Sequence, residues 1–215
     1  MARENDRLQG LASRVRTPDV ADAMGRMHRH RCHINDLVTP TPGRILLGPA
    51  ITISFLPSCE EALPLEHYNF SQLFHDAIEN GAQGRVLVLA GNGHPGVSLG
   101  GGSKLSLVAA HGLAGVLADG RLRDFTEIAT YDFAAYCLGQ TTKWGGDVVT
   151  PFEANRPVVV SGVTVRPGDY VFADASGAVV IPAAQVLGVL EEANRIAQVE
   201  AAFVDRIRNE APAAE

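Results

Sequence analysis

The alternation of apolar runs with glycine-rich polar stretches is clearest between residues 85 and 124. Residues 85–90 are nearly all β-branched or leucine, which is typical of a strand covered on both faces. Six glycines follow within the next twelve residues, and residues 103–111 then predict a helix of about two to three turns. A second apolar strand at residues 113–118 leads into a polar group that contains Asp119, Arg123 and Asp124. The pattern predicts one strand–loop–helix–strand unit with polar side chains in its loops.

A predicted helix and a predicted strand come first in the chain. Residues 17–27 predict a helix, in which Thr17 suits the N-cap and Pro18 the first turn. Residues 44–55 predict a strand, and we expect it to break at Gly48–Pro49, because proline removes a backbone donor and glycine weakens a strand. A break of this kind indicates a bulge or a barrel corner.

Further elements follow the central unit or lie just before it. Apolar spacing predicts a helix at residues 70–78, and turn residues separate short β-runs within residues 163–182. The chain from residue 182 onward predicts one long helix, whose broad apolar face suits a subunit contact. No stretch resembles a linker, so we expect one α/β domain over residues 1–215.

Composition narrows the classes of function. The 215 residues are 46% hydrophobic, enough for one full core, and the net charge is −6 with a pI near 5.6. An acidic chain is a poor partner for nucleic acid, because neutralising phosphates takes clustered lysine and arginine. We find no apolar run of bilayer length and no N-terminal signal pattern, so we expect a cytoplasmic protein that binds neither nucleic acid nor membrane. The three cysteines are an odd number without a CxxC pair, which argues against a disulfide framework.

Two motifs match cofactor-binding patterns, but their surroundings argue against them. The segment GNGHPG at residues 91–96 fits the dinucleotide pattern G-x-G-x-x-G, and Asp119 follows near where a ribose-binding acid belongs. Pro95 and the later glycines delay the helix, so the last glycine of the motif does not open it. Metal-binding side chains also cluster at His28, His30, Cys32 and His33. Ligand sets normally come from separated elements, so an exposed connector is the better interpretation.

The second glycine cluster offers better chemistry. Residues 100–102 are all glycine and let a ligand approach the backbone, while the helix that begins near Ser103 offers unpaired N–H groups to an anion. Arg123 can form a charge-assisted contact with the same anion, and Asp124 offers an oxygen ligand to a divalent metal. Spacing alone leaves one alternative open, a buried Arg–Asp pair that only holds the loop together.

The chain has only two lysines, Lys104 and Lys143, so a Schiff-base enzyme would have to use one of them. Lys104 lies at the end of the glycine-rich loop. The sequence shows no second cation and no apolar pocket that would lower the pKa of Lys104. Schiff-base catalysis is therefore a secondary hypothesis.

Four segments together resemble the RraA-like family. The string HGLAGVLADGRLRD at residues 111–124 is similar to the family signature G-x-x-G-x-V-x-D-G-x-x-R-D, with Leu117 where Val or Ile is usual. Three further segments are similar to family segments in the same order, at residues 17–25, 43–53 and 166–182. The resemblance extends over residues 17–205, the core of a single RraA-like domain.

The resemblance implies a compact α/β fold like that of the phosphohistidine swivelling domains, with N- and C-terminal helices. It also implies homotrimers or hexamers with sites between subunits. The family groups the regulator of ribonuclease E activity with metal-dependent aldolases that release pyruvate, the 4-hydroxy-4-methyl-2-oxoglutarate and 4-carboxy-4-hydroxy-2-oxoadipate aldolases. By position, Asp124 is the metal ligand and Arg123 holds pyruvate and its enolate. Glu200 matches a glutamate that approaches the metal from a neighbouring subunit.

The same resemblance assigns substrate-binding positions and shows one departure. The substrate-binding residues are expected to be Gly101, Gly102, Ser103, Lys104, Arg123 and Asp119, the last by orienting Arg123 or closing the turn. The aldolases carry an acidic residue at the position of Gly102, where it positions the base that takes the hydroxyl proton of the substrate. Retro-aldol cleavage needs that base. Decarboxylation of oxaloacetate does not, so the departure favours decarboxylation or a substrate that brings its own base.

The resulting hypothesis is a Mg²⁺- or Mn²⁺-dependent carbon–carbon lyase that acts on small 2-oxo acids and forms a pyruvate enolate. Arg123 and Asp124 are its expected catalytic residues. The alternative is a non-catalytic regulator that binds a larger protein, such as an RNA-degrading enzyme. The presence of both Arg123 and Asp124 favours the enzyme.

Overall fold

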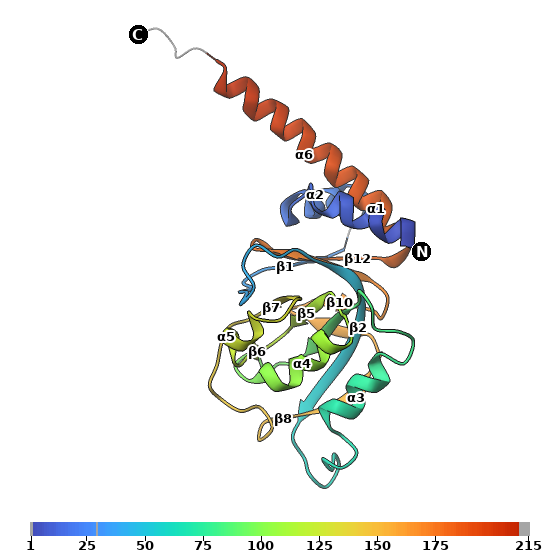
Figure 1. The fold of residues 1–215 in the computed structure, drawn as a ribbon, viewed down its shortest axis with the longest axis vertical. Coiled ribbons are helices and arrows are strands. Elements are labelled where there is room, and N and C mark those ends of the chain that lie inside the picture. The colour runs from blue at the N-terminus through green and yellow to red at the C-terminus, as the bar shows by residue number, and fades with distance from the viewer. Residues whose placement is uncertain (1, 29, 211–215) are drawn as a thin grey trace.

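Short strands and short helices form the centre of the chain, between two N-terminal helices and one long C-terminal helix (Figure 1). The computed structural model describes residues 2–28 and 30–210. The helices are α1 (Ala2–Ala12), α2 (Thr17–Met27), α3 (Phe70–Ala77), α4 (Gly102–Ala110), α5 (Phe125–Ile128), the 3-10 helix η1 (Ala183–Gln185) and α6 (Val186–Arg208). The strands are β1 (His33–Ile34), β2 (Leu46–Pro57), β3 (Val86–Ala90), β4 (Ser98–Gly100), β5 (Gly115–Ala118), β6 (Arg121–Leu122), β7 (Ala134–Cys137), β8 (Val149–Ala154), β9 (Val158–Val160), β10 (Val163–Val165), β11 (Tyr170–Asp174) and β12 (Gly177–Ile181).

The main sheet is mixed. Its strand order is β1-β12-β11-β2-β3-β5-β7, and β8 pairs with the end of β2. The neighbours β2, β3, β5 and β7 run parallel, whereas the other pairs are antiparallel. A strand followed by a helix and a parallel strand places its following loop at the carboxyl edge of the sheet, where ligands commonly bind. The predicted α/β class is confirmed, and the likeness to the phosphohistidine swivelling domains stays a prediction.

Both faces of the parallel strands are buried, as their unbroken apolar sequences predict. On one face, Leu87 and Leu89 of β3 pack with α3 and α4 in one apolar cluster. On the other face, Val86 and Val88 pack with the β9–β10 hairpin. A third cluster joins α1, α2 and α6 to β11 and β12. Figure 1 shows these three helices together at one end of the molecule, away from α3, α4 and α5.

Most predicted elements form, with small changes at their ends. The helix at residues 17–27 is confirmed, but its N-cap is Arg16 and not Thr17. Thr17 already belongs to the helix, and its N–H donates to Asp174 Oδ2 at 2.8 Å. The strand β8 was not predicted, because the polar residues around residue 150 hide its alternation.

The predicted break at Gly48–Pro49 is wrong, since β2 runs without interruption from Leu46 to Pro57. Ala50 N–H donates to Asp169 O on the β11 side, so the nitrogen of Pro49 faces the β3 side. Pairing with β3 begins only at Ala50, so no ladder bond is lost at Pro49. Gly48 is required for another reason: a Cβ there would overlap the carbonyl oxygen of Gly84.

Gly48→Ala is therefore expected to lower the free energy of unfolding by about 2 kcal/mol, because the new methyl group meets backbone that cannot turn away. The matched control is Gly25→Ala in α2, where nothing lies within 4 Å of an added Cβ. That variant is expected to gain about 0.5–1 kcal/mol from the higher helix propensity of alanine. Urea unfolding of both variants measures the difference, and equal stabilities would contradict the prediction.

The long C-terminal helix α6 confirms the element predicted from residue 182. Its first half packs on α1 and α2, whereas its second half extends beyond the body (Figure 1). Val199, Phe203 and Ile207 are 71%, 53% and 49% exposed on this second half. A subunit contact at this face stays a prediction. Among the residues described, no helix is both long and apolar enough to cross a membrane.

Candidate active site

The two halves of the unit at residues 85–124 meet at the carboxyl edge of the parallel strands. Strands β4 and β6 pair in parallel beyond the ends of β3 and β5. This pairing places the glycine cluster beside the polar group: Arg123 N–H donates to Gly100 O at 2.9 Å, and Gly102 N–H donates to Asp124 Oδ2 at 3.1 Å. The predicted unit is therefore closed by hydrogen bonds between its loops.

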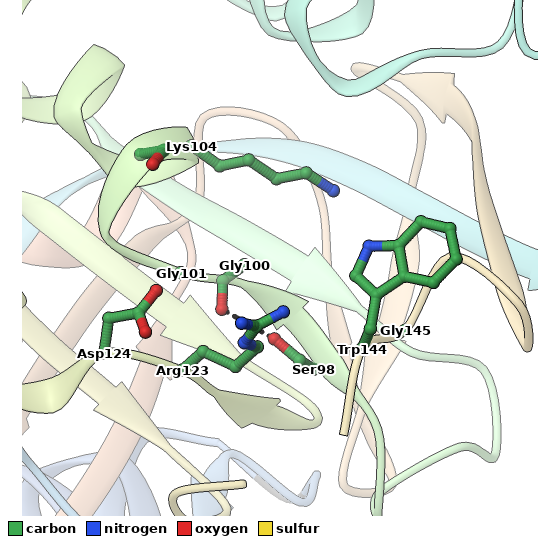
Figure 2. Close-up of a pocket in the computed structure, with 9 residues that line it drawn as sticks. Ser98, Gly100, Gly101, Lys104, Arg123, Asp124, Trp144 and Gly145 are labelled. Atoms are coloured by element: carbon green, nitrogen blue, oxygen red, sulfur yellow. Dashed lines mark hydrogen bonds between the residues drawn. The ribbon is translucent and has the colours of Figure 1, made fainter. Parts of the chain in front are cut away.

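A cavity of about 180 Å³ opens between these loops (Figure 2). Its lining residues are Ser98, Gly100, Gly101, Ser103, Lys104, Arg123, Asp124, Trp144 and Gly145. Asp124 and Arg123 lie on one side of it, and the Lys104 side chain extends from α4 toward the indole of Trp144. Five of the predicted site residues therefore share one cavity: Gly101, Ser103, Lys104, Arg123 and Asp124.

Asp124 lies at the N-cap of α5 in the left-handed region, with φ 58° and ψ 44°. Asp and Asn tolerate this conformation better than most other residues. The carboxylate points back at the glycine cluster, and a Cβ on Gly101 would lie 2.6 Å from Asp124 Oδ2. Gly101 is therefore glycine because Asp124 takes the space of a side chain.

Two cationic side chains, Arg123 and Lys104, line the cavity. Within the described residues, the guanidinium of Arg123 has neither a hydrogen-bond partner nor an ion-pair partner. The alternative of an Arg–Asp pair that only holds the loop is therefore not what the structure shows. Lys104 Nζ lies 5.3 Å from the ring centroid of Phe70. The residue is exposed overall, but desolvation of its ammonium group by the surrounding walls lowers the pKa of Lys104.

Gly102 does not line the cavity. Its surroundings show whether another residue supplies the carboxylate that the aldolases carry at this position. The carboxylate of Glu127, on α5, occupies the space over Gly102 so closely that a Cβ there would overlap it. The Tyr131 hydroxyl lies 2.8 Å from Glu127 Oε1 and 3.2 Å from Gly102 O. The hydrogen bond to Glu127 is the main cause that raises the pKa of Tyr131. A carboxylate is therefore present at this place, although residue 127 contributes it.

Asp119 and Glu200 lie elsewhere in the chain's fold. Asp119 is not a lining residue of the cavity, and its Oδ1 accepts from Ser161 N–H at 3.1 Å and Ser161 Oγ at 2.9 Å. It therefore holds the β9–β10 turn and does not orient Arg123. Glu200 lies on α6, where its Oε2 is 3.9 Å from Arg16 Nη2. In Figure 1, α6 lies at one end of the molecule, away from α4 and α5, so Glu200 and Asp124 do not meet within this chain.

The structure also adds residues that the sequence did not single out. Ser98, Trp144 and Gly145 line the cavity, and Glu127 lies behind Gly102. Trp144 is 59% exposed and is the single tryptophan of the chain. Its being the single tryptophan was the one feature of the sequence that could have indicated a role for it in the site. The group His28, His30, Cys32 and His33 is not gathered into a metal site: nowhere in residues 2–28 and 30–210 do three His, Cys, Asp or Glu side chains meet in a way that could hold a metal ion.

Comparison with known proteins identifies the family. A family model described as RraA-like, Aldolase/RraA, matches residues 17–180. The chain belongs to the RraA-like family. A relative from Halalkalibacterium halodurans, named "Putative 4-hydroxy-4-methyl-2-oxoglutarate aldolase", is 31% identical over 119 residues, which are 55% of this chain and 56% of that protein. Protein DlpA of Legionella pneumophila is 28% identical over 143 residues, or 65% of this chain and only 22% of that protein. The RraA-like chain thus spans about half the length of the Halalkalibacterium halodurans relative and about a fifth of the length of DlpA.

Solved structures agree with the family. RraAS2 of Streptomyces coelicolor, titled an unusual member of the RNase ES inhibitor RraA protein family, superposes with a TM-score of 0.79 at 25% identity. That match covers 94% of this chain and 98% of the other. An uncharacterised Pseudomonas syringae protein superposes with a TM-score of 0.78 at 20% identity, over 95% and 94% of the two chains, which shows the fold alone. The superposition with RraAS2 therefore supports an RraA-like fold over 94% of this chain.

Proposed function

We propose that this RraA-like chain is a Mg²⁺- or Mn²⁺-dependent carbon–carbon lyase that acts on 2-oxo acids and releases pyruvate. The main support is the free guanidinium of Arg123, which lines one cavity together with Asp124 and Lys104. A guanidinium without a partner in a concave site suits a carboxylate ligand. Two relatives carry the name "Putative 4-hydroxy-4-methyl-2-oxoglutarate aldolase", and this name supports the same class of substrate.

The metal requirement is supported by the donors that the chain offers. Among the residues that the structure describes, Asp124 is the one carboxylate that lines the cavity, and of its two oxygens Oδ2 accepts from Gly102 N–H. Mg²⁺ is commonly held by one or two carboxylates together with water and substrate oxygens, whereas structural zinc needs four protein ligands. Asp124 therefore fits Mg²⁺ or Mn²⁺. We propose that Glu200 of a neighbouring copy completes the site in a trimer or hexamer.

The residues of the chain have separate tasks in this proposal. Asp124 would hold the divalent cation, which would act as a Lewis acid on the keto group of the substrate. Arg123 binds the substrate carboxylate and stabilises the negative charge of the enolate as the carbon–carbon bond breaks. Ser103 and Lys104 lie in the first turn of α4, where backbone N–H groups lack helix partners and can donate to the same anion.

Glu127 can replace the acidic residue that is missing at position 102, so the aldolase reaction becomes a candidate again. Retro-aldol cleavage requires removal of a hydroxyl proton, and a carboxylate near Asp124 can position the water that takes it. We propose that Glu127, fixed by Tyr131, has this role. Decarboxylation of oxaloacetate needs no such proton transfer. Both reactions are therefore open to this site, and Glu127 is expected to matter for only one of them.

Removal of divalent metal is expected to abolish pyruvate release. The test incubates the full chain with oxaloacetate or 4-hydroxy-4-methyl-2-oxoglutarate, before and after treatment with a chelator, and measures pyruvate with a coupled dehydrogenase. Mg²⁺ or Mn²⁺ added after removal of the chelator is expected to restore the rate. Loss of the metal should lower the enzyme-dependent rate by at least about a thousandfold, since the Lewis acid stabilises the developing charge by several kcal/mol. Turnover that is independent of metal would contradict the proposal.

Schiff-base catalysis by Lys104 is a second candidate, because one structural observation favours it. The sequence showed no surroundings that would lower the pKa of Lys104, but desolvation beside Phe70 does lower it. An amine with a lowered pKa is a better nucleophile at neutral pH. Borohydride reduction in the presence of pyruvate distinguishes the two mechanisms: a stable adduct on Lys104 supports the Schiff base, and an unmodified, chelator-sensitive enzyme supports the metal.

A regulatory role is the remaining alternative, supported by the solved relative titled as a member of the RNase ES inhibitor family. A non-catalytic regulator would bind a larger protein and would release no pyruvate from any 2-oxo acid. Retention of an RNA-degrading enzyme on the immobilised chain, together with no turnover, would favour this role over the lyase.

A further inference from the structure

A second cavity of about 250 Å³ adjoins the cavity that contains Arg123 and Asp124, which we call the catalytic cavity because the proposed function places the reaction there. The two cavities share four lining residues: Ser98, Lys104, Trp144 and Gly145. They therefore lie on either side of one junction, formed by the side chains of Lys104 and Trp144. Figure 2 shows these two side chains pointing toward one another across the opening.

The walls of the two cavities differ in chemistry. The catalytic cavity has Asp124, Arg123 and three glycines, whereas the second cavity is lined mainly by aromatic and aliphatic side chains. These side chains are Phe55, Leu65, Tyr68, Phe70, Val149 and Pro151. Phe55, Phe70 and Val149 are buried at 2%, 5% and 3% exposure, and Tyr68 stacks on Phe152 with ring centroids 6.0 Å apart. The second cavity is thus a preformed apolar compartment, and we call it the aryl compartment.

The charges at the junction restrict what can enter. Among the described residues that line the aryl compartment, Lys104 is the only cation, and its ammonium group already lies over the Phe70 ring. The described lining of the compartment has no arginine and a single amide side chain, Asn69, to pair a second carboxylate. A charged group there would lose its hydration without compensation. An apolar ring gains from the same walls, and an apolar cavity of about 150 Å³ can hold benzene.

We propose that the aryl compartment binds an aryl or similarly sized apolar substituent on C4 of the 2-oxo acid whose keto and carboxylate groups lie at Arg123 and Asp124. This assignment rests on the proposed function, because it takes the position of the 2-oxo acid from it. It names the substrate class: 4-hydroxy-2-oxo acids with an apolar C4 group, which retro-aldol cleavage would convert to pyruvate and an apolar aldehyde or ketone.

The test compares two ligands that cannot undergo retro-aldol cleavage, because neither has a C4 hydroxyl group. 2-Oxo-4-phenylbutanoate places a ring on C4, and 2-oxobutanoate lacks the ring. Calorimetric titration of the Mg²⁺-loaded full chain is expected to show binding of the phenyl compound that is at least about tenfold tighter, from burial of the ring. Trp144, the single tryptophan, gives a second readout, since the phenyl compound should change its fluorescence and 2-oxobutanoate should change it less.

A variant pair locates the effect. Leu65 is 58% exposed at the rim of the aryl compartment, so Leu65→Glu should fold normally and place a charge against the ring. It is expected to remove the preference for the phenyl compound and to leave the affinity for 2-oxobutanoate within about twofold. The control is Val159→Glu, which alters a 52% exposed valine of β9 that lines neither cavity.

The outcomes separate the two proposals. If 2-oxobutanoate binds and the phenyl group adds no affinity, or if Leu65→Glu leaves the preference unchanged, the aryl compartment is not part of the substrate site. A side chain from a second copy that fills the compartment would give that same result. If neither ligand binds in the presence of Mg²⁺, the proposed function itself fails.

Discussion

Asp124→Asn is expected to lower pyruvate release from oxaloacetate by about a hundredfold to a thousandfold, with little change in stability. Asparagine tolerates the left-handed backbone at φ 58°, and its amide oxygen can still accept from Gly102 N–H. What the variant loses is the negative charge that binds the divalent cation. The measurement is kcat for pyruvate release across a Mg²⁺ titration, and the deficit should shrink as the metal concentration rises.

Asp36→Asn is a matched control for this prediction. Asp36 is an exposed residue with φ 60°, so the same substitution is made in the same backbone conformation, outside the cavity. Asp36→Asn should retain full activity and the same unfolding midpoint. Full activity of Asp124→Asn, or an equal loss in both variants, would remove Asp124 from the catalytic site.

Glu127→Gln is expected to separate the two reactions of the proposed lyase. Cleavage of 4-hydroxy-4-methyl-2-oxoglutarate should slow by about a hundredfold, because the group that positions the base for the hydroxyl proton is neutralised. Decarboxylation of oxaloacetate removes no hydroxyl proton and should change by no more than about threefold. The ratio of the two kcat values therefore measures the role of Glu127, and a variant with a general folding defect would slow both reactions alike.

An exchange of the carboxylate between positions 102 and 127 tests the same role by gain of function. In Glu127→Ala the space over Gly102 is empty, so Gly102→Asp should fit there and restore much of the aldolase rate. Gly102→Asp alone should destabilise the chain, because the new Cβ overlaps the Glu127 carboxylate. Glu79→Gln, at an exposed glutamate after α3, is the neutral control. A double variant no better than Glu127→Ala would show that the carboxylate over Gly102 has no part in the reaction.

Much of the site could be predicted from local pattern. The strand–loop–helix–strand unit at residues 85–124 has a strong local signal, because its strands are buried on both faces and glycines mark its loops. The same signal placed Arg123 and Asp124 together after the second strand. The prediction of a strand break at Gly48–Pro49 was wrong. The rule that proline interrupts a strand assumes that its nitrogen faces a paired strand, whereas the nitrogen of Pro49 faces the β3 side before the pairing with β3 begins.

The contacts of the other predicted and observed residues depend on pairs that are distant in sequence. Asp119 binds Ser161, which is 42 residues away, so its neighbour Arg123 was a poor guide to its partner. Trp144 comes from a polar loop without regular periodicity, and only the packed loops show that it forms a wall of the cavity. The proposed contact of Glu200 with a neighbouring copy depends on a surface outside this chain, so it stays a prediction.

The sequence by itself determined which segments become buried strands and helices. It also showed the resemblance to the RraA-like family and placed Arg123 and Asp124 in one loop. Only the tertiary structure decided that the Arg123 guanidinium has no partner among the described residues, that Lys104 is desolvated beside Phe70, and that Glu127 fills the space over Gly102. The physical reason is the range of the interactions. Periodicity and turn residues act over a few positions, whereas the register of β4 on β6 and the packing of α5 on α4 bring residues 102 and 127 together.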